Sequence, residues 1–397
     1  MTRRHAATLR SLAAMLVSFV VLGWTTPAAA QDTAAPMSER LANDIREQVN
    51  HLNVVVRDVA GTEFKGRIAV TSFRPPGDGP FPVALMSHGR APPARRATPL
   101  RQRYEVLARY LVSKGFAVVV PTRLGYGETF GQGDPEAGGS CDAVRFEAMS
   151  MVASEQVLQV VESLRKQPWA DVSRWVAMGQ SVGGLATVAL AWRHAPGLVA
   201  AINFAGGAGG NPETRAGAPC SPELLERLWQ ERAKQAPVAM LWMYWHNDLY
   251  WGEHWPQRWA SAWAQGGGQL EFHQLPAAGK DGHNGSAIDM DTWVPLAEQF
   301  LGHHGFMQSG IVHRPAAAAQ LRLDDLSALP AGANTRAAYQ SKFLASKPPR
   351  AFAIGASGQY GWASGDWAMG RALGACAAPR GVACKLYAVD DDVVWAP

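Results

Sequence analysis

Short runs of hydrophobic residues recur along the first three quarters of the chain, and segments with helical periodicity separate them. Uninterrupted apolar runs of about 4–8 residues are typical of strands buried on both faces, as in a parallel sheet. The first two predicted strands flank a turn at Gly61 and are expected to form a hairpin. The predicted strands cover residues 54–59, 67–73, 82–87, 116–120, 174–179, 198–204, 237–244 and 269–275.

The intervening segments show the spacing of amphipathic helices. In residues 101–114, Leu107, Tyr110 and Leu111 share one helical face. Further helices are predicted over 41–52, 142–166 and 183–194. Strands that alternate with helices predict an α/β protein whose doubly wound, mostly parallel sheet is covered on both faces.

This alternation ends near Gly302, and we expect the α/β domain to cover residues 31–302. The stretch 303–333 is rich in Pro and Ala from His313 onward and is interpreted as a linker or a wrapping arm. In residues 334–397, short strands are predicted at 351–354, 360–363 and 383–389, with one helix over 365–376. This pattern predicts a small C-terminal α+β module.

The N-terminal segment resembles an export signal. Arg3, Arg4 and Arg10 precede an apolar run over 12–24, and three alanines end at Ala30. A basic start, a short apolar run and small residues at the end describe a secretory signal peptide. A membrane anchor is the alternative, but the run is shorter than the roughly 20 residues that span a bilayer. We therefore expect cleavage after Ala30, a periplasmic or secreted protein, and no membrane span after cleavage.

Charge adds little to this picture. The chain has 37 Lys and Arg against 33 Asp and Glu, a net charge of +4, and three of the arginines lie in the N-terminal segment. The remainder is nearly neutral and shows no basic stripe interleaved with aromatic residues, so we expect no nucleic-acid partner. With 47% hydrophobic and 18% charged residues, a long disordered chain is excluded.

Four cysteines, Cys141, Cys220, Cys376 and Cys384, suit an oxidising compartment. No Cys and His residues have the spacing of a zinc site, and we expect no metal. Four cysteines allow three pairings. We favour Cys376 with Cys384, which would close a small loop, and Cys141 with Cys220.

The strongest chemical signal is the sequence Gly-Gln-Ser-Val-Gly at residues 179–183. It follows a predicted strand and opens a predicted helix, which is the context of a nucleophile elbow. The turn is so tight that side chains at Gly179 and Gly183 would collide with neighbouring backbone. Ser181 would be the strained, exposed nucleophile, and the Val182 N–H would bind an oxyanion. A glycine-rich turn without a chemical role is the alternative.

A serine nucleophile needs a base and an acid, which follow it in the order Ser, acid, His in this architecture. His283 lies in a loop directly after the last predicted strand. Asp248 follows the preceding strand, and its carboxylate would accept a hydrogen bond from His283 Nδ1. Asp281 is the rival acid, but it is only two residues from His283 and badly placed to reach that nitrogen.

The second oxyanion donor is expected after the strand 82–87, from the N–H of Gly89 or Arg90. Tyr126, Trp245 and Trp251 are predicted to contact substrate. Two groups of residues have less specific interpretations. Arg90, Arg95, Arg96, Arg101 and Arg103 are interpreted as part of a solvated loop, with attraction of an anionic substrate as the alternative. Trp251, Trp255, Trp259 and Trp263, four residues apart, are interpreted as core or lid packing, with an aromatic platform for substrate as the alternative.

The sequence resembles the dienelactone hydrolase-like branch of the α/β-hydrolase superfamily over about residues 50–302. The motifs are Met-Ser-His-Gly at 86–89, Pro-Thr-Arg-Leu-Gly-Tyr-Gly-Glu at 121–128, Gly-Gln-Ser-Val-Gly-Gly at 179–184, Asp248, and Gly-His at 282–283. Dienelactone hydrolases proper carry a Cys nucleophile, whereas this chain has Ser181. The resemblance therefore implies a serine esterase. The C-terminal module resembles a small bacterial extracytoplasmic module of unknown role.

These observations predict a secreted serine hydrolase that cleaves small-molecule or polymeric carboxylic esters through an acyl-enzyme, without a cofactor. Two alternatives are a peptidase like the prolyl oligopeptidases and a polymer- or wall-binding protein with a vestigial hydrolase domain.

Overall fold

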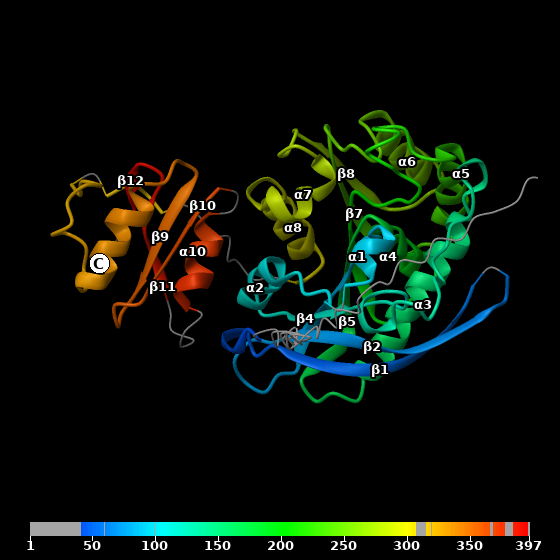
Figure 1. Ribbon diagram of the computed structural model, residues 1–397, viewed down its shortest axis with the longest axis horizontal. Coiled ribbons are helices and arrows are strands. Elements are labelled where there is room, and N and C mark those ends of the chain that lie inside the picture. The colour runs from blue at the N-terminus through cyan, green and yellow to red at the C-terminus, as the bar shows by residue number, and fades with distance from the viewer. Residues whose placement is uncertain are drawn as a thin grey trace, which may run out of the picture. The chain divides into compact units, whose positions relative to one another are not determined.

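The computed structural model describes residues 41–58, 60–98, 100–306, 315–318, 320–365, 368–377 and 384–395, so the expected signal peptide lies outside the described residues. Its largest element is an eight-stranded sheet with the order β1-β2-β4-β3-β5-β6-β7-β8 (Figure 1). The strands are β1 (Gln48–Arg57), β2 (Glu63–Phe73), β3 (Phe81–Ser87), β4 (Ala117–Pro121), β5 (Ala170–Gln180), β6 (Leu198–Phe204), β7 (Ala239–Trp245) and β8 (Leu270–Leu275).

Most of this sheet is parallel. β4, β3, β5, β6, β7 and β8 run in the same direction, and only β1 with β2 and β2 with β4 pair antiparallel. The strands next to β3 in the sheet are β4 on one side and β5 on the other, so the chain order reverses there. Ligands of doubly wound sheets bind at the carboxyl ends of the strands at such a switch point.

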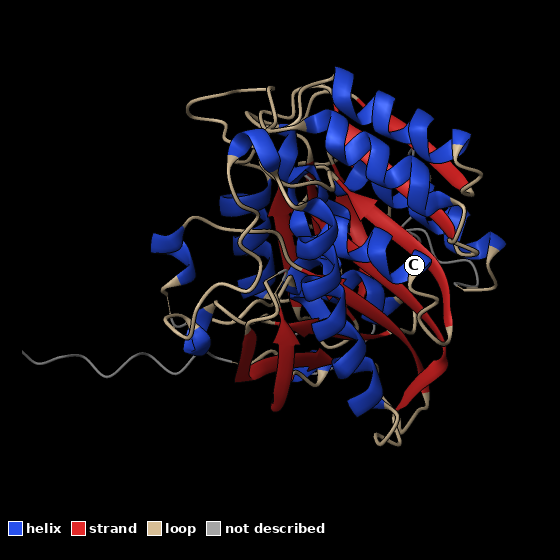
Figure 2. Ribbon diagram, turned by 90° about the vertical axis from the view of Figure 1, so that its right-hand side faces the viewer, coloured by secondary structure: helices blue, strands red, loops and turns tan. Residues whose placement is uncertain are grey.

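Helices cover both faces of the sheet (Figure 2). One face carries a core that includes Leu185 of α4 and Trp259 of α6, and the other includes Leu111 of α2 and Trp293 of α8. The helices are α1 (Pro93–Arg96), α2 (Glu105–Ser113), α3 (Phe146–Leu164), α4 (Val182–Trp192), α5 (Pro222–Ala233), α6 (His254–Gln265), α7 (Gly285–Ile288) and α8 (Met290–His303). The prediction of a doubly wound, mostly parallel α/β sheet is confirmed.

The helix predicted over residues 41–52 is wrong. Only the short 3-10 helix η1 (Asn43–Ile45) forms there, and β1 begins at Gln48. β1 pairs residue by residue with β2, from Gln48 opposite Ser72 to Arg57 opposite Glu63. The ladder hydrogen bonds of this long hairpin override the local helical spacing, because every second side chain can still turn inward from a strand.

The four tryptophans spaced four residues apart, from Trp251 to Trp263, serve largely to pack the protein interior. Trp251 lies before α6, whereas Trp259 and Trp263 lie within it and are fully buried. The ring centroids of Trp229 and Trp259 are 5.5 Å apart, as are those of Trp242 and Trp263. Core packing is confirmed for these two α6 residues.

The C-terminal residues form a second, antiparallel sheet with the order β10-β9-β11-β12. Its elements are α9 (Ala333–Ala338), β9 (Arg350–Gly355), β10 (Tyr360–Ser364), α10 (Ala368–Ala377), β11 (Cys384–Val389) and β12 (Asp392–Val393). Leu329 is buried against this unit, and the Ala318 N–H donates to Val393 O at 2.7 Å. The described part of the proline- and alanine-rich stretch is therefore a wrapping arm rather than an extended linker.

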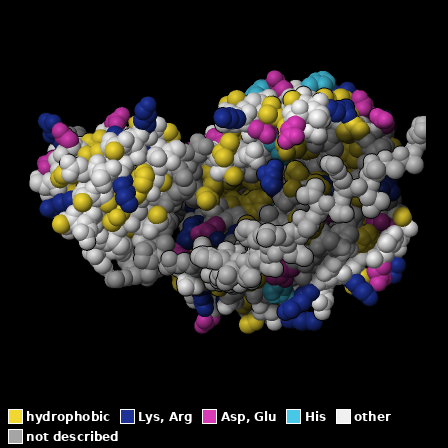
Figure 3. All heavy atoms as spheres, viewed as in Figure 1, with side chains coloured by type: hydrophobic (Ala, Val, Ile, Leu, Met, Phe, Trp, Pro, Cys, Tyr) yellow, Lys and Arg dark blue, Asp and Glu magenta, His cyan; other side chains and the backbone are white. Residues whose placement is uncertain are grey.

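Both expected disulfides are present. Cys141 bonds to Cys220 across 79 residues of sequence, and Cys376 bonds to Cys384 across eight. Within the described ranges, no helix is both long and apolar enough to cross a membrane. On the face shown in Figure 3, basic and acidic side chains are interspersed.

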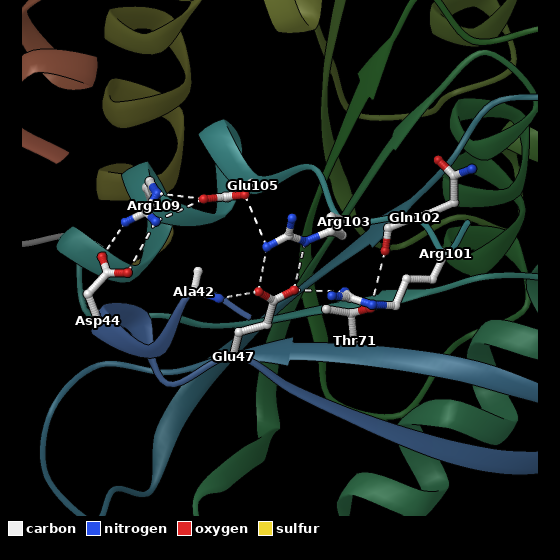
Figure 4. A network of polar contacts seen from close by, with 9 residues as sticks. All are labelled: Ala42, Asp44, Glu47, Thr71, Arg101, Gln102, Arg103, Glu105 and Arg109. Atoms are coloured by element: carbon white, nitrogen blue, oxygen red, sulfur yellow. Dashed lines mark hydrogen bonds and ion pairs between the residues drawn. The ribbon is translucent and has the colours of Figure 1, made fainter. Parts of the chain in front are cut away.

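A buried carboxylate anchors the segment that precedes β1 (Figure 4). Glu47 is 3% exposed. It accepts hydrogen bonds from the Ala42 N–H at 2.6 Å and Arg103 Nε at 2.8 Å, and it pairs with Arg101 at 2.7 Å. Nearby, Arg109 binds both Asp44 and Glu105. These ion pairs join the η1 segment to α2 and to the loop that leads into it.

The pH dependence of this anchor follows from the pKa of Glu47. Burial raises that pKa, but hydrogen bonds from Arg103, from the Ala42 N–H and from Arg101 outweigh burial and lower it below its usual 4.5. A carboxylate with a lowered pKa in the folded state stabilises the fold above its unfolded pKa. This contribution is lost as the pH falls through the folded pKa.

Replacing Glu47 with Gln should lower the free energy of unfolding by about 3 kcal/mol at pH 7, because two partly buried guanidinium groups lose their anion. The difference from wild type should shrink as the pH falls through the lowered pKa of Glu47, because the wild-type side chain then becomes neutral as well. Urea unfolding at pH 7 and pH 3 measures both values. Glu63→Gln, which removes the partner of Arg57 in an exposed pair, is the control and should change little. A loss at pH 3 as large as at pH 7 would contradict the electrostatic account.

Candidate active site

The turn between β5 and α4 holds Ser181 in a conformation that side chains rarely adopt. Its φ is 57° and its ψ is −123°. Strain of this kind persists only where the surrounding structure enforces it, and it is concentrated at functional sites. Ser181 is 6% exposed and lines a pocket, so its hydroxyl can reach a bound molecule.

Close backbone approach requires the glycines of this turn. A Cβ on Gly179 would lie 2.1 Å from Gly183 O, and one on Gly183 would lie 2.0 Å from Ser87 O. A Cβ at Gly184 would meet Asn203 Oδ1 at 2.3 Å. No larger residue fits at these three positions without moving backbone or Asn203. The turn therefore has the geometry that the sequence motif predicted.

Helix α4 begins directly after Ser181. Val182 is its first residue, so the Val182 N–H has no partner within the helix. The positive end of the helix dipole also lies here, and it favours negative charge. This end of α4 is thus suited to stabilise an oxyanion.

Asp248 and His283 meet at the ends of neighbouring segments. His283 Nδ1 lies 3.0 Å from Asp248 Oδ2 and 3.2 Å from Oδ1. Both side chains are nearly fully buried. A buried carboxylate at this distance holds the imidazole in one orientation and favours the tautomer with the proton on Nδ1.

Asp281 has a different role. Its Oδ1 accepts from the N–H of His283 at 3.0 Å and from the N–H of Leu249 at 3.0 Å. It thus joins the loop of His283 to the loop of Asp248 through backbone groups. The carboxylate that contacts the ring of His283 is that of Asp248.

Two aromatic residues next to Asp248 pack on the imidazole. Asp248 Oδ1 accepts from the N–H groups of Tyr250 at 2.7 Å and Trp251 at 3.1 Å. The ring of Tyr250 stacks on His283 with 3.9 Å between centroids, and Trp251 meets it edge-on at 5.3 Å. One turn therefore positions both the acid and the aromatic rings that enclose the histidine. Sequence reasoning did not single out Tyr250, although its position two residues after the acid was a usable signal.

A buried ion pair supports the loop that follows β3. The side chains of Arg123 and Glu136 are both fully buried, and Arg123 Nε donates to Glu136 at 2.5 Å. Arg123 Nη1 donates to His88 O at 2.7 Å and to Ser87 Oγ at 2.9 Å. Burial opposes the charge of Arg123, but Glu136 outweighs it and raises the pKa of the guanidinium.

His88 completes this support. The Arg123 N–H donates to His88 Nε2 at 3.1 Å, so Nδ1 carries the proton and donates to Gly89 O at 2.7 Å. Burial, and then the charge of Arg123, hold the pKa of His88 well below its usual value, so the ring stays neutral. His88 is thus a fixed hydrogen-bond bridge within the loop.

Gly89 lies against the nucleophile. A Cβ on Gly89 would fall 3.1 Å from Ser181 Cβ and 2.6 Å from Gln180 Oε1. Burial raises the pKa of Tyr104 to about 12, against a smaller lowering by a hydrogen bond with the Gly89 backbone.

Ser181 and Val182 open into a pocket of about 490 Å³. The pocket is lined by residues 90–93, 95, 96, 181, 182, 208–213, 250 and 251. A larger groove of about 830 Å³ between β1, α3 and α5 contains none of the predicted catalytic residues.

Of the three aromatic residues predicted to contact substrate, only Trp251 lines this pocket. Tyr126 is buried and packs edge-on against His88, 4.5 Å between centroids. Trp245 is fully buried, and its indole N–H donates to Asp289 at 2.7 Å. The expectation is corrected for Tyr126 and Trp245, because both side chains are buried and neither lines the pocket.

The arginines of the 90–103 region are mostly paired, which corrects their interpretation as a solvated loop. Arg90 and Arg96 bind Asp134, and Arg101 and Arg103 bind Glu47. Arg95, by contrast, is exposed at the rim of the pocket. The pairing partners lie far away in the sequence, so local spacing could not reveal them.

Sequence reasoning also missed residues 208–213, which form one side of the pocket. The signal was the run of glycines directly after β6, the strand next to the nucleophile strand. In the part of the chain that the structure describes, no cluster of three or more His, Cys, Asp or Glu side chains could hold a metal ion.

The doubly wound sheet and the nucleophile turn define a serine hydrolase with the α/β-hydrolase fold. A family model described as X-Pro dipeptidyl-peptidase (S15 family) matches residues 66–275, more than half of the chain. The chain therefore belongs to this family. A search of curated proteins found no match. The superfamily implied by the sequence motifs is confirmed, with peptidase S15 as the matching family.

Three solved structures illustrate the similarity at low identity. A protein titled a dienelactone hydrolase from Klebsiella pneumoniae is 17% identical, with a TM-score of 0.42, and the alignment covers 65% of this chain and 99% of that one. The acylaminoacyl peptidase of Pyrococcus horikoshii is 13% identical, with a TM-score of 0.45, over 66% of this chain but only 43% of the peptidase. A variant of esterase E22 is 10% identical, with a TM-score of 0.45, over 64% and 99% of the two chains.

Replacing Glu136 with Gln should lower the free energy of unfolding by about 3–5 kcal/mol, because it leaves the guanidinium of Arg123 buried without its counter-ion. Urea unfolding measures the loss. The double variant Arg123→Met with Glu136→Leu should recover much of it, since neither charge then remains buried.

Glu162→Gln is the matched control, because Glu162 pairs with Arg165 on the exposed side of α3. If Glu136→Gln lowers the free energy of unfolding no more than Glu162→Gln does, the buried pair of Arg123 and Glu136 is unimportant to the fold.

Proposed function

We propose that this chain is a secreted serine hydrolase that cleaves carboxylic esters through an acyl-enzyme formed on Ser181. The observation that carries the proposal is the 3.0 Å contact between Asp248 and His283 beside the pocket that Ser181 lines. An oriented imidazole next to a strained, accessible serine is the arrangement needed to activate a weak nucleophile.

In the proposed reaction, Ser181 Oγ attacks the acyl carbon while His283 Nε2 takes the hydroxyl proton. Asp248 stabilises the resulting imidazolium. The alcohol then leaves with the proton from His283. Water, deprotonated by His283, attacks the acyl-enzyme and releases the carboxylic acid and free Ser181.

Ser181 Oγ and the His283 ring make no hydrogen bond in the described residues, which hold no substrate. Catalytic hydrogen bonds in free enzymes are often long and tighten when a substrate binds. The side chain of Gln180, the residue before Ser181, links their two loops, because Gln180 Nε2 donates to His283 O at 2.9 Å. Tyr250 also lines the Ser181 pocket while it stacks on His283.

For the oxyanion hole we propose the N–H groups of Val182 and Arg90. Gly89 is the other candidate, because a Cβ on it would lie only 3.1 Å from Ser181 Cβ. Arg90 is held in place by its own side chain, whose Nη1 donates to Asp134 at 2.9 Å and to Glu136 O at 3.2 Å. A donor fixed before the reaction needs no reorganisation when charge develops, which is the basis of its catalytic value.

Cleavage of peptides is the second candidate function, and the S15 family match favours it. The same nucleophile, base and oxyanion donors serve both reactions, since each passes through a tetrahedral intermediate. Ester and peptide substrates differ in the leaving group. Comparing p-nitrophenyl acetate with an X-Pro p-nitroanilide on the same enzyme separates the two candidates.

Export is part of the proposal. It rests on the basic and apolar N-terminal segment that ends at Ala30 and on the two disulfides. Disulfides persist in oxidising compartments such as the periplasm and are rare in the cytosol.

Ser181→Ala should abolish hydrolysis of p-nitrophenyl acetate, with kcat lower by several orders of magnitude, because residues that act as a unit fail together. Folding should be nearly unchanged, since the variant removes one partly accessible hydroxyl. Stopped assays with purified protein and a thermal melt measure both effects. Full residual turnover of the variant with either chromogenic substrate would reject Ser181 as the nucleophile. No turnover by wild type with either substrate would favour a vestigial hydrolase domain.

Asp248→Asn should lower kcat by about 10⁴, as expected when an amide favours the wrong histidine tautomer. Asp281→Asn is the matched control. Its side-chain oxygen can still accept from the His283 and Leu249 N–H groups, so kcat should fall less than about tenfold. A larger loss of kcat for Asp281→Asn than for Asp248→Asn would identify Asp281 as the acid.

A further inference from the structure

The pocket next to Ser181 lies between two irregular segments. Residues 90–96, here called the arginine wall, follow β3 and include α1. Residues 208–213, here called the glycine wall, lie between β6 and α5. Because neither wall is part of the sheet, contacts with other segments must fix the width of the pocket between the two walls.

The start of the glycine wall is attached to the catalytic scaffold. The Gly207 N–H donates to Ser181 O at 3.1 Å. Trp251 Nε1 donates to Ala205 O at 2.7 Å, and the Tyr244 hydroxyl donates to Gly206 O at 2.8 Å. Residues 205–207 are therefore fixed by β7 and by the turns of Ser181 and Asp248.

Next along the glycine wall, Gly209 contacts Cys220. The Cys220 N–H donates to Gly209 O at 3.0 Å, and a Cβ on Gly209 would lie 3.0 Å from Cys220 Cβ. Arg215, from the same loop, contacts the sulfurs of both Cys141 and Cys220. The wall thus rests on the disulfide at Gly209, whereas Gly210 packs against Tyr250 and Trp251.

The other half of the disulfide belongs to the segment that holds the arginine wall. Residues 134–141 lead from Asp134, which binds Arg90 and Arg96, to Cys141. Burial raises the pKa of Asp134, but Arg90 and Arg96 outweigh it and lower that pKa, so the carboxylate stays charged. One short segment therefore carries both the anchor of the arginine wall and the sulfur bonded to the glycine wall.

We propose that the Cys141–Cys220 disulfide sets the width of the substrate pocket by joining its two walls, and so determines substrate affinity rather than the chemical step. This inference rests on the proposed function, because it assigns the Ser181 pocket to the substrate. Residues 79 apart in sequence are connected here by one covalent bond directly behind the pocket.

The separation of affinity from chemistry has a structural reason. In the described part of the chain, the hydrogen bonds of Ser181, Asp248 and His283, and those of residues 205–207, do not involve either sulfur. Loss of the disulfide should loosen residues 208–213 while the proposed catalytic residues stay in place. Binding to a pocket that must first be ordered is weaker, because the ordering opposes binding.

The test replaces both cysteines with serine. Cys141→Ser with Cys220→Ser should raise KM for p-nitrophenyl acetate about tenfold and leave kcat within about twofold. Cys376→Ser with Cys384→Ser is the matched control, since it removes the disulfide between α10 and β11, and its KM should equal that of wild type. An unchanged KM in the Cys141 and Cys220 variant, or an equal rise in both variants, would overturn the proposal.

A second variant keeps the proposal testable if the first does not fold. Asn211 Oδ1 accepts from the N–H groups of Glu213 at 3.0 Å and Thr214 at 3.1 Å, which shapes the end of the glycine wall. Asn211→Ala leaves the disulfide intact and should also raise KM, by a smaller factor. An unchanged KM would show that the glycine wall does not set affinity.

Labelling of Ser181 by a fluorophosphonate probe tests the role of the disulfide independently of whether the substrate is an ester. If wild type does not hydrolyse p-nitrophenyl acetate, the ester assignment fails. The probe concentration that gives half the maximal labelling rate still measures affinity of the same pocket. That concentration should rise only in the Cys141 and Cys220 variant, and equal values in all three proteins would overturn the role of the disulfide.

Discussion

The backbone at Ser181 is held at a positive φ because β3, β5 and α4 approach one another more closely than any side chain permits. Gly179 and Gly183 allow this approach, since a Cβ on either would lie about 2 Å from a carbonyl oxygen. The same approach places the N-terminus of α4 behind the serine and Gly89 beside it. Both the nucleophile and the proposed oxyanion donors thus depend on one close-packed turn at the switch point of the sheet.

Around this turn, ion pairs between buried or partly buried side chains hold the loops that are not part of the sheet. Glu136 neutralises Arg123 beneath the loop of His88, and Asp134 binds Arg90 and Arg96 at the pocket. In a low-dielectric interior such pairs tolerate little displacement, because an unpaired buried charge is costly. The covalent bond between Cys141 and Cys220 continues the same support to the opposite wall. The pocket is therefore assembled from irregular segments whose positions are set by side chains.

The histidine is enclosed in a comparable way. Asp248 Oδ1 accepts from the backbone of Tyr250 and Trp251, while Oδ2 faces His283 Nδ1. The stacked ring of Tyr250 covers one face of the imidazole. An aromatic face attracts a cation, so this arrangement also favours the imidazolium that the proposed mechanism forms.

Among the three possible pairings of the four cysteines, the sequence only favoured the pairing that the structure shows. The sequence by itself determined the doubly wound sheet and the tight glycine turn at Ser181, and it predicted Asp248 and His283 as the acid and base of the proposed reaction. These features follow from local patterns, because buried strands, tight glycine turns and residues at strand ends have constraints that a few neighbouring positions express. Tertiary structure alone decided that the strand begins at Gln48, that Trp245 and Tyr126 are buried, and that the arginines near the pocket are paired. It also brought residues 208–213 to Ser181. These outcomes depend on partners that are distant in the sequence, such as Glu47 for Arg103, more than fifty residues away. Local spacing cannot encode a contact that forms only when distant segments pack together.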